Sequence, residues 1–358
     1  MKGTVLNMFS MNSTYRSITS DPDIYLYVRM FIPPDILNAI PPEMYDCSMQ
    51  EIKDSITLPW GVPYISEQVV YAAVCAAEIK EGNKWSTVSV WNPVREDFVP
   101  AADNSKNCAC IFFRKEPAAE CSGSKRPAVI ICPGGAYEKV AMSHEGFTYA
   151  EILENAGFRS FVLNYRTVPN YYPEPQKDLL LAIKYLRLNS EKLGIDPEKI
   201  ILVGSSAGGH LVASEALYSE DINAALLKEL AASNPVLYEK YADISSAPDM
   251  LGLCYPVISF VSEQHEGSFI NLSGGDESLR DKLSVDLNAD SSYPRTFIWR
   301  CDDDELVPAS NSDRMYEALK KAGVEAKICR YPSGGHGIGL ADGTSAEGWI
   351  HKMIEFFR

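Results

Sequence analysis

The sequence predicts an α/β fold, with a mostly parallel central sheet covered by helices on both faces and preceded by an N-terminal, mainly helical extension. From Trp85 onward, apolar strand-like runs alternate with helix-like stretches, which is typical of parallel sheets. Several runs, such as 128–132, are apolar throughout, as expected for strands buried on both faces. One run, 200–203, leads through a glycine-rich turn directly into a helix-like stretch.

The first 80 residues differ from the rest of the chain. They are rich in Tyr, Pro and Met, and we expect short helices broken by prolines at 33–34, 41–42 and 59. A longer helix is expected over 66–80. We predict that residues 1–80 form an extension serving as a cap or as an interface in a homo-oligomer, and that 81–358 form the main domain. The alternative is that the six tyrosines of the extension (15, 25, 27, 45, 64 and 71) only pack it onto that domain.

The main domain is predicted from short apolar runs bounded by turn residues. We expect strands over residues 86–91, 108–114, 128–132, 158–165, 200–203, 250–255, 295–299 and 326–331. Helices are expected over residues 144–156, 177–193, 209–218 and 346–357. The stretch 177–193 illustrates the helical pattern, because its apolar residues recur with helical spacing and Gly194 follows it as a stop signal.

Composition limits the classes of partner. The chain carries 48 acidic and 33 basic residues, a net charge of −15, so phosphate backbones and anionic lipids repel it, and neither nucleic acid nor membrane is expected as a partner. The longest apolar run, 69–77, is too short to span a bilayer. The nine cysteines are scattered along the chain, and Cys108-Ala-Cys110 is not accompanied by a second pair with metal-ligand spacing. Residues 1–20 lack a signal-peptide pattern. A cytoplasmic protein is therefore predicted.

The glycine-rich turn after 200–203 has the sequence Gly204-Ser205-Ser206-Ala207-Gly208. Gly-x-Ser-x-Gly between a strand and a helix is typical of a nucleophile elbow, a turn so tight that its flanking positions must be small. This turn would expose the Ser206 hydroxyl beside the amide of Ala207. Serine is a weak nucleophile at its own pKa, so a base must lie within hydrogen-bond reach.

His336 is the strongest candidate for that base. It lies in the loop Ser333-Gly334-Gly335-His336-Gly337, directly after the last expected strand. His210 follows the elbow on its helix and would face away from Ser206, so we expect it to have a packing role. His144, His265 and His351 have no motif around them and are expected to be ordinary surface or core histidines.

The third member of such a site is a carboxylate that orients the imidazole. The loop 301–308, after the penultimate expected strand, contains Asp302, Asp303 and Asp304. We predict Asp304 as the acid because it stands three residues before Val307-Pro308, the spacing that marks the acid in folds with this kind of elbow, and we expect the other two to be solvated. A shift of one residue to Asp303 remains the alternative, because the loop begins unusually with Arg300-Cys301.

Acyl transfer also requires donors for the oxyanion that develops on the substrate. Pro133-Gly134-Gly135-Ala136-Tyr137 follows the strand 128–132. Small residues here let the backbone approach a substrate oxygen, so we predict the amides of Gly135 and Ala136, together with that of Ala207, as the oxyanion hole. Tyr137 is predicted to contact the substrate.

From about Trp85 to Arg358 the chain resembles the α/β-hydrolase fold, in the esterase/lipase branch that includes acetyl-xylan and feruloyl esterase-like proteins. The order Ser206, Asp304, His336 matches the order of this fold. Ala136 departs from the family's usual third Gly, and Arg300-Cys301 replaces its usual His-Gly or His-Thr. The resemblance is carried by 133–137, Ser-His-Glu-Gly (143–146), 162–166, 204–211, 248–259, 303–308 and 334–337.

The resemblance implies a serine carboxylesterase that hydrolyses short-chain acyl esters through a Ser-His-Asp triad and an acyl-enzyme intermediate. Acetyl esters of carbohydrates are the expected substrates, small molecules or oligosaccharides are the expected partners, and the chemistry requires no metal or organic cofactor. One alternative is a prolyl-oligopeptidase-type peptidase, although 80 residues are too few for the β-propeller that usually precedes that domain. The other is a non-catalytic binding protein on a hydrolase scaffold, which would be expected to lose part of the site.

Overall fold

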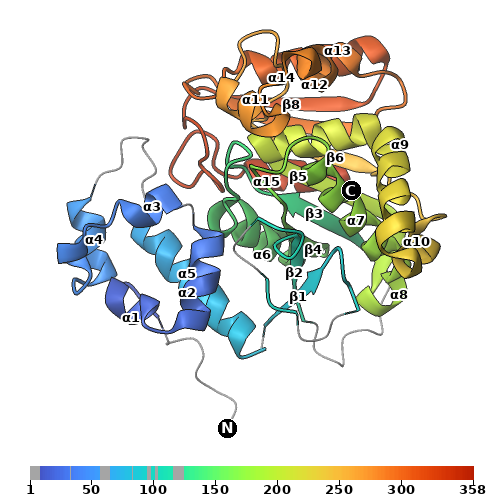
Figure 1. Ribbon diagram of the computed structural model, residues 1–358. Helices are drawn as coiled ribbons and strands as arrows, with labels where there is room; N and C mark the ends of the chain where they lie inside the picture. Colours follow the sequence, from blue (N-terminus) through green and yellow to red (C-terminus); the bar gives the residue numbers. More distant parts are fainter. Residues whose placement is uncertain are drawn as a thin grey trace.

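A computed structural model describes residues 9–32, 34–56, 65–82, 84–94, 98–100, 104–115 and 125–358. Its centre is an eight-stranded sheet in the order β1-β2-β4-β3-β5-β6-β7-β8 (Figure 1). β1 pairs antiparallel with β2, and β2 with β4, whereas the remaining neighbours are parallel. The strands are β1 (Trp85–Ser89), β2 (Cys110–Arg114), β3 (Arg126–Cys132), β4 (Arg159–Asn164), β5 (Ile195–Ser205), β6 (Met250–Cys254), β7 (Arg295–Cys301) and β8 (Ala326–Tyr331).

Helices cover both faces of this sheet, so the predicted fold class is confirmed. In Figure 1 the strands β3 and β4 lie between α6 on one side and α7 on the other. None of the described helices is both long and apolar enough to cross a membrane. The helical segments of this part are η2 (Ser143–Phe147), α6 (Thr148–Asn155), α7 (Glu174–Leu188), α8 (Ser190–Leu193), α9 (Ala207–Ser233), α10 (Pro235–Tyr241), α11 (Glu266–Ser273), η3 (Glu277–Leu279), α12 (Arg280–Leu283), α13 (Val285–Asn288), α14 (Ser310–Ala322) and α15 (Trp349–Phe357).

Several helices differ from the sequence prediction. α9 runs from Ala207 to Ser233, well beyond the expected end at residue 218, and it changes direction at Tyr218, whose φ and ψ are −112° and 18°. The helices α10, α11 and α14, and the short helical segments η3, α12 and α13, were not predicted. In α14 the buried apolar residues are Met315 and Leu319, four residues apart on one face, so the helical spacing is present in the sequence although few apolar residues mark it.

The N-terminal extension packs against the sheet through aromatic side chains. Phe31 lies with its ring centre 5.3 Å from that of Phe112 on β2 and 4.7 Å from that of Phe147 on η2. Trp85 on β1 completes the cluster, 4.8 Å from Phe147. The extension comprises α1 (Tyr15–Thr19), α2 (Pro22–Phe31), α3 (Pro34–Asn38), η1 (Pro42–Met44), α4 (Met49–Ser55) and α5 (Ile65–Lys80).

These contacts agree with a packing role for aromatic residues of the extension. The predicted helix over 66–80 is confirmed as α5, whereas Pro59 and Tyr64 lie outside the described residues. α5 ends at Lys80 and β1 begins at Trp85, at the position where the domain boundary is predicted. The boundary itself, and the role as cap or homo-oligomer interface, remain predictions.

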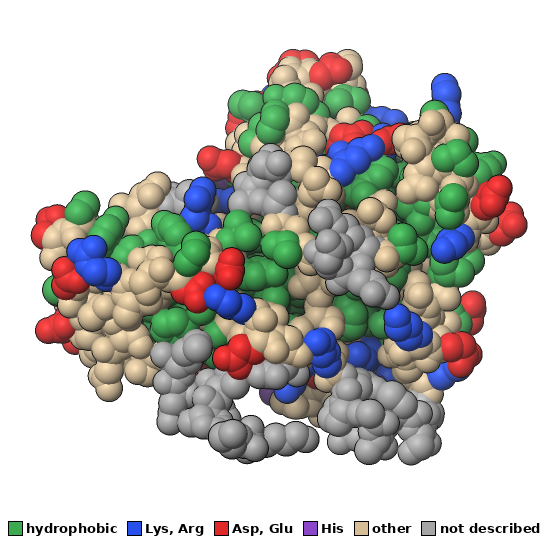
Figure 2. Space-filling view, turned by 60° about the horizontal axis from the view of Figure 1, so that its bottom comes forward, with side chains coloured by type: hydrophobic (Ala, Val, Ile, Leu, Met, Phe, Trp, Pro, Cys, Tyr) green, Lys and Arg blue, Asp and Glu red, His purple; other side chains and the backbone are tan. Residues whose placement is uncertain are grey.

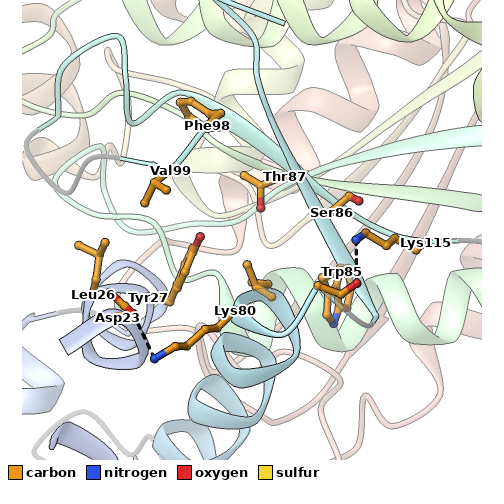
Figure 3. Close-up of a pocket in the computed structure, with 12 residues that line it drawn as sticks. Asp23, Leu26, Tyr27, Lys80, Trp85, Ser86, Thr87, Phe98, Val99 and Lys115 are labelled. Atoms are coloured by element: carbon orange, nitrogen blue, oxygen red, sulfur yellow. Dashed lines mark hydrogen bonds and ion pairs between the residues drawn. The ribbon is translucent and has the colours of Figure 1, made fainter. Parts of the chain in front are cut away.

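A cleft of about 560 Å³ lies where α2 and α5 meet β1 (Figure 3). Its charged groups are already engaged within the protein. Lys80 Nζ lies 2.6 Å from Asp21 Oδ2 and 3.1 Å from Asp23 Oδ2, and Lys115 Nζ donates a hydrogen bond to the carbonyl of Gly82 over 2.7 Å. The cleft is therefore a partly open part of the interface between the extension and the edge of the sheet.

Charged side chains of both signs are exposed on the surface. In Figure 2 acidic and basic side chains are interspersed over the visible, described part of one face. Several form exposed ion pairs, such as Arg16 with Asp46 at 2.5 Å and Lys53 with Glu67 at 2.7 Å. Exposed pairs of this kind contribute little to stability, on the order of 0–1 kcal/mol.

The core contains one unusual carboxyl group. Glu215 on α9 has no exposed surface, and neither of its side-chain oxygens has a hydrogen-bond partner among the described residues. Burial raises the pKa of Glu215 well above its ordinary value. The folded protein therefore holds a proton that the unfolded chain releases above about pH 4.3.

We predict that Glu215→Gln stabilises the protein progressively as the pH rises. A carboxyl whose folded pKa is raised contributes its full stability at low pH and loses it as the pH increases, by up to about 1.4 kcal/mol per pH unit. In urea unfolding at pH 4.5, 6 and 7.5, the free energy of unfolding of the variant, relative to that of the parent protein, should increase with each rise in pH. Glu220→Gln, an exposed change on the same helix, is the control. An equal difference between Glu215→Gln and the parent at all three pH values would contradict the prediction.

Candidate active site

The sequence Gly204–Gly208 forms the tight turn expected between a strand and a helix. β5 ends at Ser205, α9 begins at Ala207, and Ser206 between them has φ 53° and ψ −120°, a strained conformation for a residue with a side chain. A Cβ on Gly204 would lie 2.2 Å from the Gly208 carbonyl oxygen, and a Cβ on Gly208 would lie 2.1 Å from that of Cys132. Both glycines are therefore sterically required.

The turn brings Ser206 into a chain of hydrogen bonds with two residues from distant loops. Ser206 Oγ lies 2.8 Å from His336 Nε2, and His336 Nδ1 lies 2.6 Å from Asp304 Oδ2. Asp304 is held in turn, because its Oδ1 accepts hydrogen bonds from the amides of Leu306 and Val307. A carboxylate on Nδ1 assigns the proton to that nitrogen and leaves Nε2 free to accept the serine proton.

The acid loop has the register that the sequence analysis favoured. Asp304 meets the imidazole, whereas Asp303 accepts hydrogen bonds from the amides of Gly334 and Gly335, at 2.9 and 2.8 Å. Asp302 pairs with Arg300, whose Nη2 also lies 2.8 Å from Asp313 Oδ2.

Asp302 and Asp303 are both exposed, as predicted, but each also has a partner within the protein. The hydrogen bonds from the amides of Gly335 and Gly334 keep the pKa of Asp303 below its ordinary value. Asp303 thus holds the loop that carries His336. The pairing was not visible in the sequence because the partners are 31 and 32 residues away.

The loop 133–137 lies beside the turn. Gly135 has φ 132° and Ala136 has φ 56°, and a Cβ on Gly135 would lie 2.2 Å from the carbonyl oxygen of Lys139. Among the described residues, the amides of Gly135 and Ala136 have no backbone or side-chain acceptor. The amide of Ala207, as the first of α9, has no partner within its helix. These three amides can therefore donate to a bound oxygen, although their role as an oxyanion hole remains a proposal.

Tyr137 lies in a different place from the one predicted. Its side chain has no exposed surface, and its hydroxyl lies 2.8 Å from His210 Nδ1. The other nitrogen of His210, Nε2, lies 2.8 Å from the carbonyl oxygen of Leu283, and burial lowers the pKa of His210 to about 4. His210 therefore has the packing role predicted for it. The predicted substrate contact of Tyr137 is corrected, because the ring and hydroxyl are covered and engaged behind the loop.

Two further groups near the site were missed by the sequence analysis. Glu145 is a buried carboxyl that accepts a hydrogen bond from the amide of Gly134 over 2.7 Å. His265 caps α11, and its pKa is lowered by burial and, secondarily, by the charge of nearby His336. Glu145 belongs to the stretch Ser143–Gly146, which could have indicated it, whereas no signal in the sequence indicates His265.

The described residues contain no group of three His, Cys, Asp or Glu side chains arranged to hold a metal. The two cysteines of the Cys108-Ala-Cys110 motif are both buried. Burial raises the pKa of Cys110 well above its ordinary value, which keeps it uncharged. The site consists of a serine, a histidine, a carboxylate and backbone amides.

A fold of this topology, with a Ser–His–Asp chain at a strand–turn–helix elbow, is that of an α/β-hydrolase. A sequence model described as BD-FAE matches residues 117–319, and the chain belongs to this family of α/β-hydrolase esterases.

Named relatives are similar over part of their length. The chain is 33% identical over 233 residues to endo-1,4-beta-xylanase B of Butyrivibrio fibrisolvens, a match covering 63% of this chain and 34% of that protein. It is 29% identical over 246 residues to an acetylxylan esterase of Xylanibacter ruminicola, covering 67% and 45%. The chain thus spans less than half the length of these two relatives.

A solved structure is similar over nearly its whole length. The acetyl ester-xyloside bifunctional hydrolase from Caldicellulosiruptor lactoaceticus superimposes with a TM-score of 0.64 at 33% sequence identity. The match covers 76% of this chain and 95% of that one.

We predict that Asp304→Asn and Asp303→Asn differ sharply in ester hydrolysis. Asn at 304 no longer selects the correct imidazole tautomer, a change that costs on the order of 10⁴ in turnover in serine proteases. Asn at 303 keeps an oxygen for the amides of Gly334 and Gly335, so the turnover of this variant should fall by no more than about tenfold. Turnover of a nitrophenyl ester, measured alongside thermal unfolding, checks this. If Asp303→Asn lost most of its turnover while Asp304→Asn kept nearly all of it, the acid would be Asp303 and not Asp304.

Proposed function

We propose that the protein is a serine carboxylesterase that hydrolyses short-chain acyl esters, in particular acetyl esters of carbohydrates. The observation that carries the proposal is the hydrogen-bonded chain from Ser206 Oγ to His336 Nε2 at 2.8 Å and from His336 Nδ1 to Asp304 at 2.6 Å. This chain is the arrangement that turns a serine hydroxyl into a nucleophile. Membership of an esterase family supports the same reaction.

The first half of the reaction acylates the enzyme. Ser206 Oγ attacks the ester carbonyl carbon while His336 Nε2 takes the hydroxyl proton, and Asp304 stabilises the resulting imidazolium. The oxygen of the tetrahedral intermediate accepts hydrogen bonds from the amides of Gly135, Ala136 and Ala207. When the intermediate collapses, the C–O bond to the alcohol breaks and Nε2 returns the proton to the leaving oxygen.

The second half releases the acid. A water molecule attacks the acyl-enzyme carbonyl and gives one proton to His336 Nε2, through a second tetrahedral intermediate held by the same amides. Collapse breaks the bond to Ser206 Oγ, which recovers its proton from Nε2. The net reaction consumes one ester and one water and yields one alcohol and one carboxylic acid.

Two relatives support the substrate class. The names of the Xylanibacter ruminicola and Caldicellulosiruptor lactoaceticus proteins refer to acetylxylan and to an acetyl ester with a xyloside. These names favour a small acyl group on a carbohydrate over a long acyl chain or a peptide. Ala136, a residue larger than the family's usual Gly, also favours a small acyl group.

We predict that Ser206→Ala reduces ester hydrolysis to near background without unfolding the protein. Removing a triad serine costs about 10⁶ in turnover in subtilisin, because the remaining groups have no nucleophile to activate. Hydrolysis of nitrophenyl acetate, labelling by a fluorophosphonate and thermal unfolding are the measurements. Retention of most activity, or fluorophosphonate labelling of the variant at another residue, would exclude Ser206 as the nucleophile.

The acyl preference can be measured directly. We predict that nitrophenyl acetate is hydrolysed at least about tenfold more efficiently than the octanoate, because each unaccommodated methylene costs on the order of 1 kcal/mol or more. Acetylated xylo-oligosaccharides should release acetate with the parent enzyme and not with Ser206→Ala. A preference for octanoate would contradict the short-acyl assignment. Cleavage of a prolyl nitroanilide peptide in preference to all esters would favour the peptidase alternative.

A further inference from the structure

The buried carboxyl of Glu145 has an unusual set of partners. Its side chain lies in η2, directly before α6, and the residue is 2% exposed. Its charge acts on the adjacent His144, but Glu145 is in none of the ion pairs found among the described residues. Its oxygens instead accept two hydrogen bonds, from the Gly134 amide to Oε2 over 2.7 Å and from the Tyr255 hydroxyl to Oε1 over 2.6 Å. A buried carboxylate is costly, so both partners are held tightly.

The first partner belongs to the loop that carries the proposed oxyanion amides. Gly134 directly precedes Gly135 and Ala136. A Cβ on Gly134 would lie 2.8 Å from Glu145 Oε2 and 2.9 Å from Ser206 Cβ. The carboxyl of Glu145 and the Cβ of Ser206 therefore both lie against the same side of Gly134. The hydrogen bond from the Gly134 amide to Glu145 thereby anchors this loop beside Ser206.

The second partner reaches the histidine. The ring of Tyr255 lies edge-on to the imidazole of His336, with ring centres 5.0 Å apart. The Tyr255 hydroxyl also accepts a hydrogen bond from the amide of Gly339 over 3.3 Å, three residues beyond His336. Tyr255 has φ 36°, which is unusual for a residue with a side chain and is held by the surrounding packing.

We propose that Glu145 and Tyr255 act as a pair of positioning residues, which fix the oxyanion amides and the His336 imidazole relative to Ser206. The pair joins two loops that are otherwise far apart in the sequence, since Glu145 and Tyr255 are 110 residues apart. Neither residue takes part in the chemistry. This inference rests on the proposed esterase function and adds residues to the same site.

The pair should act on the transition state more than on substrate binding. Misplaced oxyanion amides lose hydrogen bonds that are strongest when the carbonyl oxygen carries charge, so turnover falls while KM changes little. Removing one complete donor costs about 10²–10³ in turnover, and displacing donors should cost less. We therefore expect Tyr255→Phe and Glu145→Gln each to lower kcat by about 10- to 100-fold, with KM within about threefold of the parent.

The experiment compares Glu145→Gln, Tyr255→Phe and the double variant in hydrolysis of nitrophenyl acetate. The kcat of the double variant should lie within about threefold of the kcat of the slower single variant, because the effects of residues that act as one unit are not additive. Inhibition by a trifluoromethyl ketone, which forms a tetrahedral adduct with the serine, should weaken in parallel with kcat/KM.

Tyr293→Phe is the matched control. Tyr293 is also buried, and its hydroxyl donates to the carbonyl of Ala213 on α9 over 2.9 Å. Tyr293 itself lies two residues before β7, at the end of that strand opposite the one near the elbow. This variant should lose similar thermal stability with unchanged kcat and inhibitor affinity. If Glu145→Gln does not fold, Tyr255→Phe carries the test alone, because it leaves the carboxyl in place.

Two outcomes would overturn the proposal. One is that Glu145→Gln and Tyr255→Phe behave like Tyr293→Phe, which would reduce the pair to a buried structural contact. The other is that the effects of the two substitutions multiply, which would show that the residues act separately. Both outcomes presuppose a parent enzyme that hydrolyses the ester and a Ser206→Ala variant that does not. A parent without activity would instead refute the proposed function.

Discussion

The tight turn at Ser206 is the constraint on which the rest of the site depends. The close approach of Gly204 to Gly208, and of Gly208 to the end of β3, leaves no room for side chains at either glycine. The strained backbone is held by neighbouring strands, since the Ser206 amide donates to the carbonyl of Cys254 over 2.9 Å and the amide of Val257 donates to that of Ser206 over 3.1 Å. Packing therefore holds the backbone of Ser206 in a conformation that local propensity alone would not favour, and this conformation exposes the hydroxyl at the end of β5.

The parallel sheet explains why distant loops meet there. Cys132 pairs with Gly204, Ser205 with Cys254, and Cys301 with Tyr331, so β3, β5, β6, β7 and β8 all end at the same edge. In parallel sheets the loops that follow the strands share that edge, where sites of α/β proteins form. Asp303 and Asp304 use it together, one to hold the loop of His336 and the other to orient its ring.

The extension connects to the same region through packing. Phe31 of α2 lies against Phe147, the last residue of η2, and η2 also carries Glu145. The aromatic cluster that joins extension and main domain therefore supports, from behind, the turn that contacts Gly134. This arrangement gives the extension a physical route to the site through rigid, close-packed side chains.

The sequence alone determined the features that depend on neighbouring residues: the elbow at 204–208, the apolar strands, the glycine-flanked His336, and Asp304 three residues before Val307. These signals are local, because a tight turn or a buried strand restricts which residues can occupy a few consecutive positions. Only the tertiary structure decided that Tyr137 faces His210, that Asp303 holds the histidine loop and that Glu145 joins Gly134 to Tyr255. These contacts join residues between 11 and 110 positions apart in the chain, and which side chains meet is set by how strands and helices pack together.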